Sequence, residues 1–205
     1  MVKIKICGMT NKADAISASR LGADMLGFVF YKKSKRCVEA VVARDIISGL
    51  PASILKVGVF VDEEPGKVLD LAATASLDAL QFHGSETPEY CAAFRGKHKV
   101  IKAFRLEERK DLKHINDYDV DLYLLDTFKS GTAGGTGKAF DWKIVTDFEF
   151  LRPVILSGGL SPKNVSRAIR EVVPYGVDVS TGVEESPGKK DPELMKKFIE
   201  EARKA

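Results

Sequence analysis

Hydrophobic residues along this chain gather in short runs that alternate with amphipathic segments from one end to the other. The runs are rich in β-branched and aliphatic residues and predict strands, while the segments between them space apolar residues three and four apart, as helices do. Alternation of strand and helix predicts a parallel sheet with right-handed crossovers. Eight strands are expected, at residues 3–7, 25–30, 56–61, 79–82, 100–104, 122–126, 154–157 and 177–180.

Capping side chains mark the start of several predicted helices. Thr87-Pro88, Ser161-Pro162 and Asp191-Pro192 each combine a capping residue with a proline suited to the first turn, and Asp141 precedes Trp142 in the same role. Eight strand–helix units with nothing left over predict an α/β fold, a closed (β/α)8 TIM barrel. No break in composition divides residues 1–205, so we expect one catalytic domain, compact for this fold.

Composition narrows the functional classes. Hydrophobic residues make up 44% of the chain and charged residues 30%, which indicates a globular protein with a substantial core. The net charge of +3 is too small and too dispersed to indicate nucleic acid as a partner. No apolar run is long enough to span a membrane and no signal peptide is visible, so we expect a cytoplasmic protein without a membrane partner. Cys7, Cys37 and Cys91 lie far apart, which suggests neither a disulfide framework nor a metal site.

The ends of the last two strands are rich in glycine. In a (β/α)8 barrel the active site is formed by the loops at the carboxyl ends of the strands, and phosphate sites commonly follow strands seven and eight. Glycines there let backbone N–H groups approach a phosphate, and a helix N-terminus adds a favourable field. The alternative is that these glycines only form tight turns. The position of the glycines after strands seven and eight favours a phosphate site, made by Gly158, Gly159, Ser180, Thr181 and Gly182.

Two polar residues lie at the carboxyl ends of predicted strands. Asp126 closes the sixth strand and delivers a carboxyl group to the rim, where it is well placed for proton transfer, although it could instead cap a turn or pair with a lysine. His83 follows the fourth strand. Because lone histidines are more often structural groups, we interpret His83 as a residue that lines the site.

Two loops at the same rim carry further candidates. The glycine-rich residues 128–140 do not form a phosphate-binding P-loop, because Thr132 occupies the place of its first glycine and Ala139 follows Lys138. We expect a mobile lid there, or plain surface loop. Arg36 lies in a charged run after the second strand and could bind a planar carboxylate through two parallel hydrogen bonds, unless the run is only a solvated face.

Cys7 ends the first strand, on the same side as Lys3 and Lys5. Free cysteines are mostly inert core groups. A position opposite a rim aspartate and beside a phosphate site favours a catalytic thiol instead. Since the thiolate is the reactive form, we expect its surroundings to lower its pKa.

Short motifs at the strand ends follow one another in order from residue 3 to about residue 191: Lys5-Ile-Cys-Gly8 with Thr10, Gly27-Phe-Val-Phe30 with Ser34 and Arg36, Gln81-Phe-His-Gly84, Leu125-Asp-Thr127, Leu156-Ser-Gly-Gly-Leu160, Val177-Asp-Val-Ser180 with Gly182-Val-Glu184, and Pro187-Gly-Lys-Lys-Asp191. Each motif is weak alone, but the ordered set resembles the phosphoribosylanthranilate isomerase family. Lys32 and Cys37 depart from it, because a proline and an aromatic residue are common at these places in the family.

The resemblance implies an isomerase of tryptophan biosynthesis. Such an enzyme converts N-(5-phosphoribosyl)anthranilate, its small-molecule partner, into 1-(2-carboxyphenylamino)-1-deoxyribulose 5-phosphate by an Amadori rearrangement, without metal or cofactor. Carried over by motif, Cys7 is the general base and Asp126 the general acid. Arg36, His83 and Asp178 are then expected to bind substrate, with Arg36 at the anthranilate carboxylate, in a monomer or homodimer.

Lys5 needs a partner of its own. Strand alternation turns it into the barrel, where an ammonium group must be paired. Asp178 on the adjoining eighth strand is the first candidate and Asp126 the second. We hypothesise that Lys5 pairs with one of them and biases Cys7 towards the thiolate.

Other functions compete with this one. A barrel that makes indoleglycerol phosphate would place a lysine and a glutamate at the strand ends, whereas Lys5 lies two residues below the rim. A non-catalytic barrel that binds a phosphorylated ligand would keep the glycine loops without needing Cys7 together with Asp126. A scaffold would explain none of the rim residues.

Overall fold

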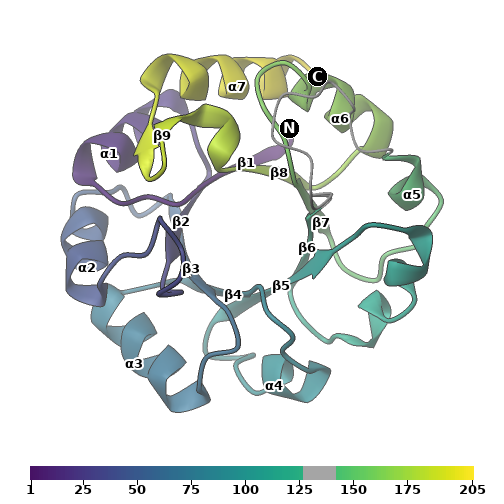
Figure 1. The fold of residues 1–205 in the computed structure, drawn as a ribbon, viewed down its shortest axis with the longest axis horizontal. Helices are drawn as coiled ribbons and strands as arrows, with labels where there is room; N and C mark the ends of the chain where they lie inside the picture. Colours follow the sequence, from purple (N-terminus) through teal and green to yellow (C-terminus); the bar gives the residue numbers. More distant parts are fainter. Residues whose placement is uncertain (127–141) are drawn as a thin grey trace.

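The computed structural model describes residues 1–126 and 142–205, and its eight parallel strands close into a barrel in the order of the chain (Figure 1). The predicted (β/α)8 barrel is therefore confirmed, and no predicted strand end is wrong by more than one residue. The strands are β1 (Lys3–Cys7), β2 (Met25–Val29), β3 (Leu55–Phe60), β4 (Ala79–Phe82), β5 (Lys99–Arg105), β6 (Leu122–Asp126), β7 (Val154–Ser157) and β8 (Gly176–Val179).

Helices cover the outside of this barrel (Figure 1). They are α1 (Lys12–Leu21), α2 (Ala40–Ser48), α3 (Pro65–Ala75), α4 (Pro88–Ala92), α5 (Lys143–Thr146), α6 (Val165–Val172) and α7 (Pro192–Lys204). The segment after β5 differs, because it forms two 3₁₀ helices, η1 (Arg109–Leu112) and η2 (Ile115–Asp117), in place of an α-helix. Asp111 closes this segment into a tight turn by accepting the backbone N–H groups of Glu107 and Glu108.

The predicted helix starts are confirmed in two places and wrong in a third. Thr87 caps α4 and Asp191 caps α7, each followed by the expected proline. Ser161 does not cap α6, which begins three residues after Pro162. The side chain of Asn164 folds back onto Ser161 N and Gly159 O at distances of 2.8 and 3.0 Å. This fold-back keeps residue 164 out of helical geometry, with φ at −130°.

Side chains alternate between two apolar layers. One layer lies between the strands and the helices and includes Ile4, Ile6 and Phe82. The other fills the barrel interior with Met25, Val57, Ala79, Ile101, Ala103, Leu122, Leu124 and Ile155. Because strand side chains repeat every second residue, the next inward positions towards the carboxyl ends form the barrel mouth. Cys7, Val29, Val59, His83, Arg105, Asp126 and Ser157 occupy these positions.

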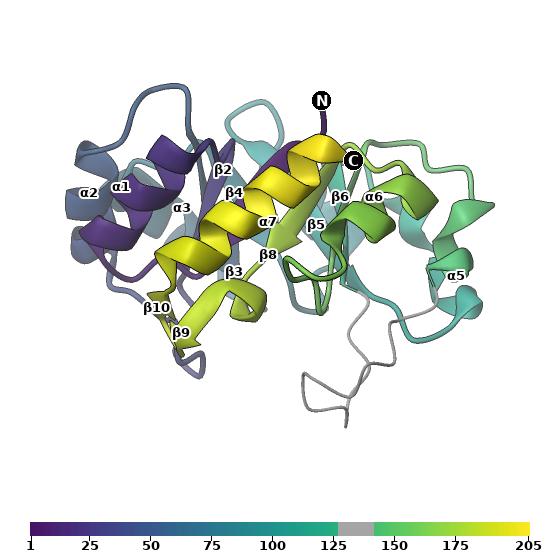
Figure 2. The ribbon, with the colours of Figure 1, turned by 90° about the horizontal axis from the view of Figure 1, so that it is seen from above.

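An extra hairpin stands between β8 and α7, so the prediction that eight units leave nothing over is wrong. After the 3₁₀ helix η3 (Thr181–Val183), β9 (Glu184–Ser186) pairs antiparallel with β10 (Lys189–Lys190). Figure 2 shows this hairpin at the end of the barrel away from the N-terminus. Two predicted features, the lid at residues 128–140 and the cap at Asp141, lie outside the described residues. In the described part, no helix combines the length and apolar character needed to cross a membrane.

Candidate active site

Cys7 lies at the inner rim of the barrel and is only 8% exposed. Val29 and Val59 pack beside it. Its neighbour in the β1–β2 register is Gly27, and a Cβ at Gly27 would stand 2.7 Å from the Cys7 sulfur. Glycine at this place therefore leaves room for the thiol.

Lys5 is completely buried one layer below Cys7. Its Nζ donates to Asp178 Oδ1 at 2.8 Å, so the predicted pairing with Asp178 is confirmed. Burial is the largest influence and disfavours the Lys5 ammonium, but Asp178 and Cys7 together outweigh it, so the pKa of Lys5 is raised. Ser157 Oγ donates to the other Asp178 oxygen at 3.0 Å. Asp178 is thus held between two protein donors, and its direct contact with substrate stays a prediction.

The pKa of Cys7 shifts in the opposite direction to the one expected from the sequence. Burial raises the pKa of the thiol, because a thiolate loses solvation inside the barrel. Lys5 acts in the expected direction and lowers the pKa, and so does Lys190, while Asp178 raises it. The net pKa is above the ordinary value, so the expected lowering is wrong: desolvation outweighs the two cations.

Lys190, which sequence analysis did not select, is fully buried at the base of the β9–β10 hairpin. Its Nζ donates to Cys7 O at 2.6 Å, Ser180 O at 3.2 Å and Glu184 Oε1 at 2.9 Å. The loops after β1 and β8 are therefore tied together by one ammonium group. The only sequence signal for it was the motif at residues 187–191, since two adjacent lysines otherwise suggest a solvated surface.

Arg36 also reaches Glu184. Arg36 Nε donates to Glu184 Oε1 at 2.7 Å and Nη2 donates to Oε2 at 2.5 Å. Although burial opposes it, these bonds and those from Lys190 lower the pKa of Glu184. The two parallel bonds predicted for Arg36 are thus made with a protein carboxylate. A contact between Arg36 and a substrate carboxylate stays a prediction, and the donors left for it are the two N–H groups of Nη1 and the second N–H of Nη2.

The predicted phosphate loops lie side by side. Gly158 and Gly159 both have positive φ, 89° and 66°, which glycine adopts without strain. A Cβ at Gly182 would stand 2.0 Å from Leu160 O, so only glycine lets the β8 loop approach the β7 loop this closely. Ser180 and Thr181 belong to the same β8 loop. The five predicted residues are therefore neighbours, and phosphate binding by them stays a prediction.

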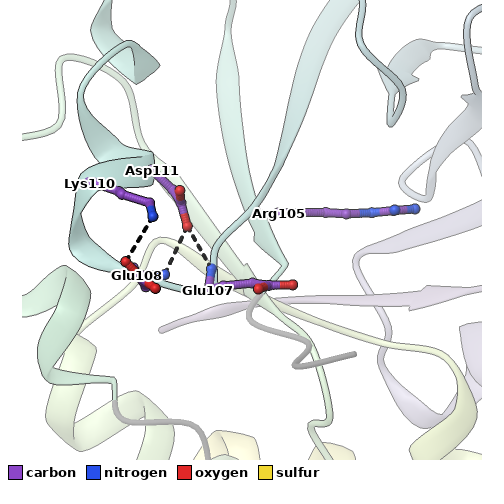
Figure 3. A pocket seen from close by; sticks show the side chains of 5 residues that line it. All are labelled: Arg105, Glu107, Glu108, Lys110 and Asp111. Atoms are coloured by element: carbon purple, nitrogen blue, oxygen red, sulfur yellow. Dashed lines mark hydrogen bonds and ion pairs between the residues drawn. The ribbon is translucent and has the colours of Figure 1, made fainter. Parts of the chain in front are cut away.

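A hollow of about 240 Å³ adjoins the mouth at the β5 loop (Figure 3). Its lining combines three acidic with two basic side chains: Arg105, Glu107, Glu108, Lys110 and Asp111. Such a lining does not suit a phosphate group. Arg105 alone belongs to the inward positions of the strands, and in Figure 3 its side chain extends away from the other four.

Asp126 is joined to His83 across the β4 and β6 ends. The Gln81 amide Nε2 lies 3.0 Å from His83 Nδ1, and His83 Nε2 lies 3.3 Å from Asp126 Oδ2. With the amide donating to Nδ1, the ring proton sits on Nε2 and points to the Asp126 carboxylate. His83 therefore orients the side chain of Asp126.

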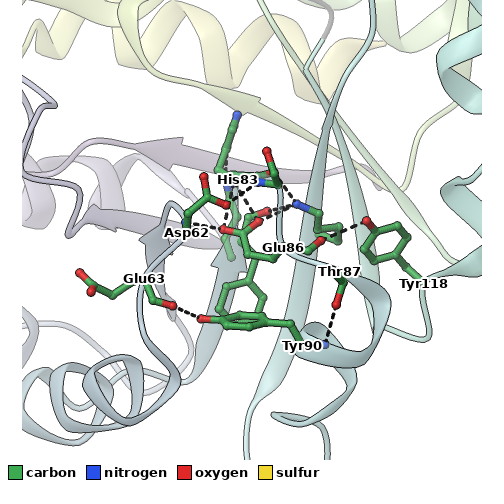
Figure 4. A network of polar contacts seen from close by, with 12 residues as sticks. Asp62, Glu63, His83, Glu86, Thr87, Tyr90 and Tyr118 are labelled. Carbon is green, nitrogen blue, oxygen red and sulfur yellow. Dashed lines mark hydrogen bonds and ion pairs between the residues drawn. The ribbon is translucent and has the colours of Figure 1, made fainter.

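The loop that carries His83 is fixed from behind by a polar network around Glu86 (Figure 4). Glu86 is 5% exposed and accepts Asp62 N and Gly84 N, each at 2.9 Å. Lys102 Nζ donates to Glu86 Oε2 at 2.7 Å and to Gly84 O at 2.8 Å. Sequence analysis missed this network because its members are separated along the chain and only the fold brings them together.

The rim thus gathers most of the predicted residues. Cys7 on β1 and Asp126 on β6 flank β7 and β8, whose glycine loops lie between them. His83 contacts Asp126 directly, whereas Arg36 reaches the loop after β8 through Glu184. Asp178 lies beneath the mouth rather than in it.

Comparison with known proteins identifies the family of this chain. A family model described as N-(5'phosphoribosyl)anthranilate (PRA) isomerase matches residues 4–201. N-(5'-phosphoribosyl)anthranilate isomerase of Desulforudis audaxviator is 51% identical over 207 residues, with 100% of both chains covered. The crystal structure of phosphoribosyl anthranilate isomerase from Thermotoga maritima is 44% identical with a TM-score of 0.93, again over 100% of both chains.

One further solved structure shows a ligand. It is a phosphoribosyl anthranilate isomerase in complex with reduced 1-(o-carboxyphenylamino)-1-deoxyribulose 5-phosphate, 42% identical with a TM-score of 0.88 over 100% of both chains. The matches cover the barrel and all the strand ends described above. This chain belongs to the N-(5'-phosphoribosyl)anthranilate isomerase family.

Proposed function

We propose that this protein isomerises N-(5-phosphoribosyl)anthranilate to 1-(2-carboxyphenylamino)-1-deoxyribulose 5-phosphate, with Asp126 as general acid and Cys7 as general base. One observation carries the proposal. A thiol and a carboxyl group face the same barrel mouth from β1 and β6, with the glycine loops of β7 and β8 between them. A phosphate held at these loops brings the attached ribose within reach of both groups.

The acid step opens the ribose ring. Protonated Asp126 gives its proton to the ring oxygen, the bond from this oxygen to C1 breaks, and the nitrogen lone pair forms a C=N⁺ iminium. His83 donates to Asp126 from the side, so the carboxylate left behind has a hydrogen-bond partner. This pairing supports Asp126 as the group that releases a proton.

The base step moves the double bond. The iminium nitrogen withdraws electrons from C2–H, and the Cys7 thiolate takes this proton, which leaves an enolamine with a C1=C2 bond. Protonation at C1 and loss of the proton on the C2 hydroxyl then give the ketone. Burial raises the pKa of Cys7, and the cations Lys5 and Lys190 limit this rise, which favours formation of the thiolate.

The two ends of the substrate are anchored on opposite sides of the reacting atoms. The phosphate is assigned to Gly158, Gly159, Ser180, Thr181 and Gly182. Arg36 is assigned to the anthranilate carboxylate through the donors that Glu184 does not use. Holding both ends fixes the ribose between acid and base, which replaces a random encounter by an oriented one.

The test follows the fluorescence of the anthranilate group after purified protein is added to N-(5-phosphoribosyl)anthranilate. We expect turnover by the wild type and a loss of kcat of about a hundredfold or more in Cys7→Ala and in Asp126→Asn. Cys91→Ala is the matched control, since Cys91 lies in α4 behind the barrel. It should keep full kcat.

The same assay separates the alternatives. A barrel that only binds a phosphorylated ligand would show no turnover in the wild type. A lyase that forms indoleglycerol phosphate would need a lysine at the mouth, whereas Lys5 is bound to Asp178 below it and Lys102 to Glu86 behind it. Absence of turnover by folded wild-type protein would refute the proposed function.

A further inference from the structure

Gln81 lies below His83 on the inner side of β4. The two residues are two positions apart, so both side chains point into the barrel. Gln81 is 1% exposed, whereas the His83 side chain is 20% exposed at the mouth. The register neighbours of Gln81 are Val59 on β3 and Ile101 on β5, neither of which carries a polar side chain. Within residues 1–126 and 142–205, the Gln81 amide therefore has one hydrogen-bond partner, His83 Nδ1 at 3.0 Å.

The unpaired oxygen of this amide shows which way the amide faces. Gln81 Oε1 is buried and has no hydrogen-bond partner among the described residues. In the reverse orientation Oε1 would accept from Nδ1, and the NH2 group would occupy the place without partners. Both N–H groups would then be buried without an acceptor, which is rarer in proteins than an under-satisfied carbonyl oxygen. The amide therefore donates from Nε2, and His83 Nδ1 accepts.

This direction decides where the proton of the general acid can lie. With Nδ1 accepting, the neutral His83 ring carries its proton on Nε2 and donates it to Asp126 Oδ2. Oδ2 then accepts, so the proton that Asp126 transfers lies on Oδ1. In the other tautomer His83 would present a lone pair at Nε2, and this lone pair would compete with the substrate for the proton of Asp126.

We propose that Gln81 is a positioning residue that keeps His83 in the Nε2–H tautomer. The proton of the general acid then stays on the Asp126 oxygen that His83 does not contact. This inference rests on the proposed function, in which Asp126 protonates the ring oxygen of the substrate. Gln81 acts through His83 and transfers no proton itself.

The first measurement reads the tautomer directly. Histidine labelled with 15N reports which ring nitrogen carries the proton, and with three histidines in the chain, His83→Asn identifies the His83 resonances by their loss. At about pH 8, where neutral imidazole predominates, we expect Nε2–H alone in the wild type. Gln81→Glu places a carboxylate at Nδ1 and should protonate this nitrogen. Gln81→Met imposes no tautomer and should give a mixture.

The His114 ring is the internal control for these spectra. Its Nδ1 lies 2.8 Å from Asp117 Oδ2 at the surface, outside the barrel mouth. The His114 resonances should be the same in the wild type and in both variants of Gln81. A shift of His114 together with His83 would mark a general structural change and would contradict a role of Gln81 through the His83 ring.

The second measurement is turnover of N-(5-phosphoribosyl)anthranilate. Gln81→Glu should lower kcat about tenfold to a hundredfold with KM within about twofold, because His83 then competes for the proton of the acid. Gln81→Met should lower kcat by less than about threefold. In a His83→Asn background the two variants of Gln81 should have equal kcat, since no ring is left to orient.

Three results would overturn the inference: a wild-type His83 ring protonated at Nδ1, an unchanged ring in Gln81→Glu, or a difference between the two variants of Gln81 that persists without His83. If Gln81→Glu does not fold, Gln81→Met decides. A mixture of tautomers there supports the inference, and Nε2–H alone overturns it. Wild-type protein without turnover overturns the proposed function instead, which the ring resonances alone cannot do.

Discussion

Among the buried lysine–carboxylate pairs of the described residues, two lie on opposite faces of the strand layer. Lys5 points into the barrel and pairs with Asp178 beneath Cys7, with side chains 0% and 8% exposed. Lys102 points outward from β5 and pairs with Glu86 beneath the loop after β4, with side chains 3% and 1% exposed. Burial and distance make the two pairs nearly identical.

Their other contacts distinguish them. Asp178 keeps the Ser157 hydroxyl as a further donor and lies close enough to Cys7 to affect its pKa. Glu86 keeps the backbone N–H groups of Asp62 and Gly84, so it holds a loop in shape. The first pair sets the charge around a thiol and the second sets the position of His83. A buried ion pair therefore reveals its role only through its remaining partners.

Lys5→Met is expected to have the largest effect. It leaves the Asp178 carboxylate buried without its cation, which should lower the free energy of unfolding by about 3–5 kcal/mol. Because Lys5 lowers the pKa of Cys7, the thiol should also become harder to ionise. Chemical denaturation measures the first effect, and the pH dependence of Cys7 alkylation, in a background without Cys37 and Cys91, measures the second.

The double variant Lys5→Met with Asp178→Asn is the control for the first prediction. It removes both charges and should recover much of the stability lost in Lys5→Met. A single variant as stable as the wild type would contradict the proposed cost of an unpaired Asp178.

Lys102→Met should cost less, about 2 kcal/mol, because the Glu86 carboxylate retains its backbone N–H donors. The pKa of Cys7 should stay where it is in the wild type. Denaturation and alkylation are again the measurements. A shift in the Cys7 pKa equal to that in Lys5→Met would show that the two pairs do not act separately.

His83→Asn should lower activity without the loss of stability expected of Lys102→Met. The half-buried contact to Asp126 at 3.3 Å contributes little to folding, but its removal leaves the acid unsupported. We expect kcat to fall about tenfold, with an unfolding midpoint close to that of the wild type. An unchanged kcat would mean that Asp126 works without His83.

The smallest expected effect is a shift in the pH dependence of kcat/KM. Burial raises the pKa of Cys7, so kcat/KM should rise with pH along a limb that lies above the ordinary value for cysteine. The limb should move higher in Lys5→Met and stay in place in Lys102→Met. Since the unfolded thiol ionises first, stability should be full below that ordinary value and decrease as pH rises towards the folded value. Wild-type profiles without this limb would contradict Cys7 as base.

The strands could be predicted because each one is a local pattern. Apolar runs predicted the eight strands, capping residues predicted the starts of α4 and α7, and the period of two turned Lys5 and Cys7 inward. The hairpin after β8 was missed, since strands as short as Lys189–Lys190 carry no pattern of their own. Its buried lysine depends on Glu184 and on the Cys7 carbonyl, which only the closed barrel brings near.

The positions of the candidate site residues could be predicted where these residues end a strand, whereas the balance of charges around them could not. Cys7, Asp126 and the glycine loops follow from position alone. The pKa of Cys7 does not, because it is the balance of burial against Lys5 and Lys190. Arg36 was expected to hold a substrate carboxylate in two parallel bonds, which stays a prediction, and its two parallel bonds to Glu184 were not foreseen.

The pair inside the barrel also constrains how sequences of this kind can change. Loss of either Lys5 or Asp178 alone leaves an unpaired charge in the barrel interior, whereas loss of both leaves a neutral pocket. The path from one state to the other therefore crosses a sequence that folds poorly. Relatives that lack a lysine at the place of Lys5 should also lack the acid at the place of Asp178, and the two positions should be inherited as a unit.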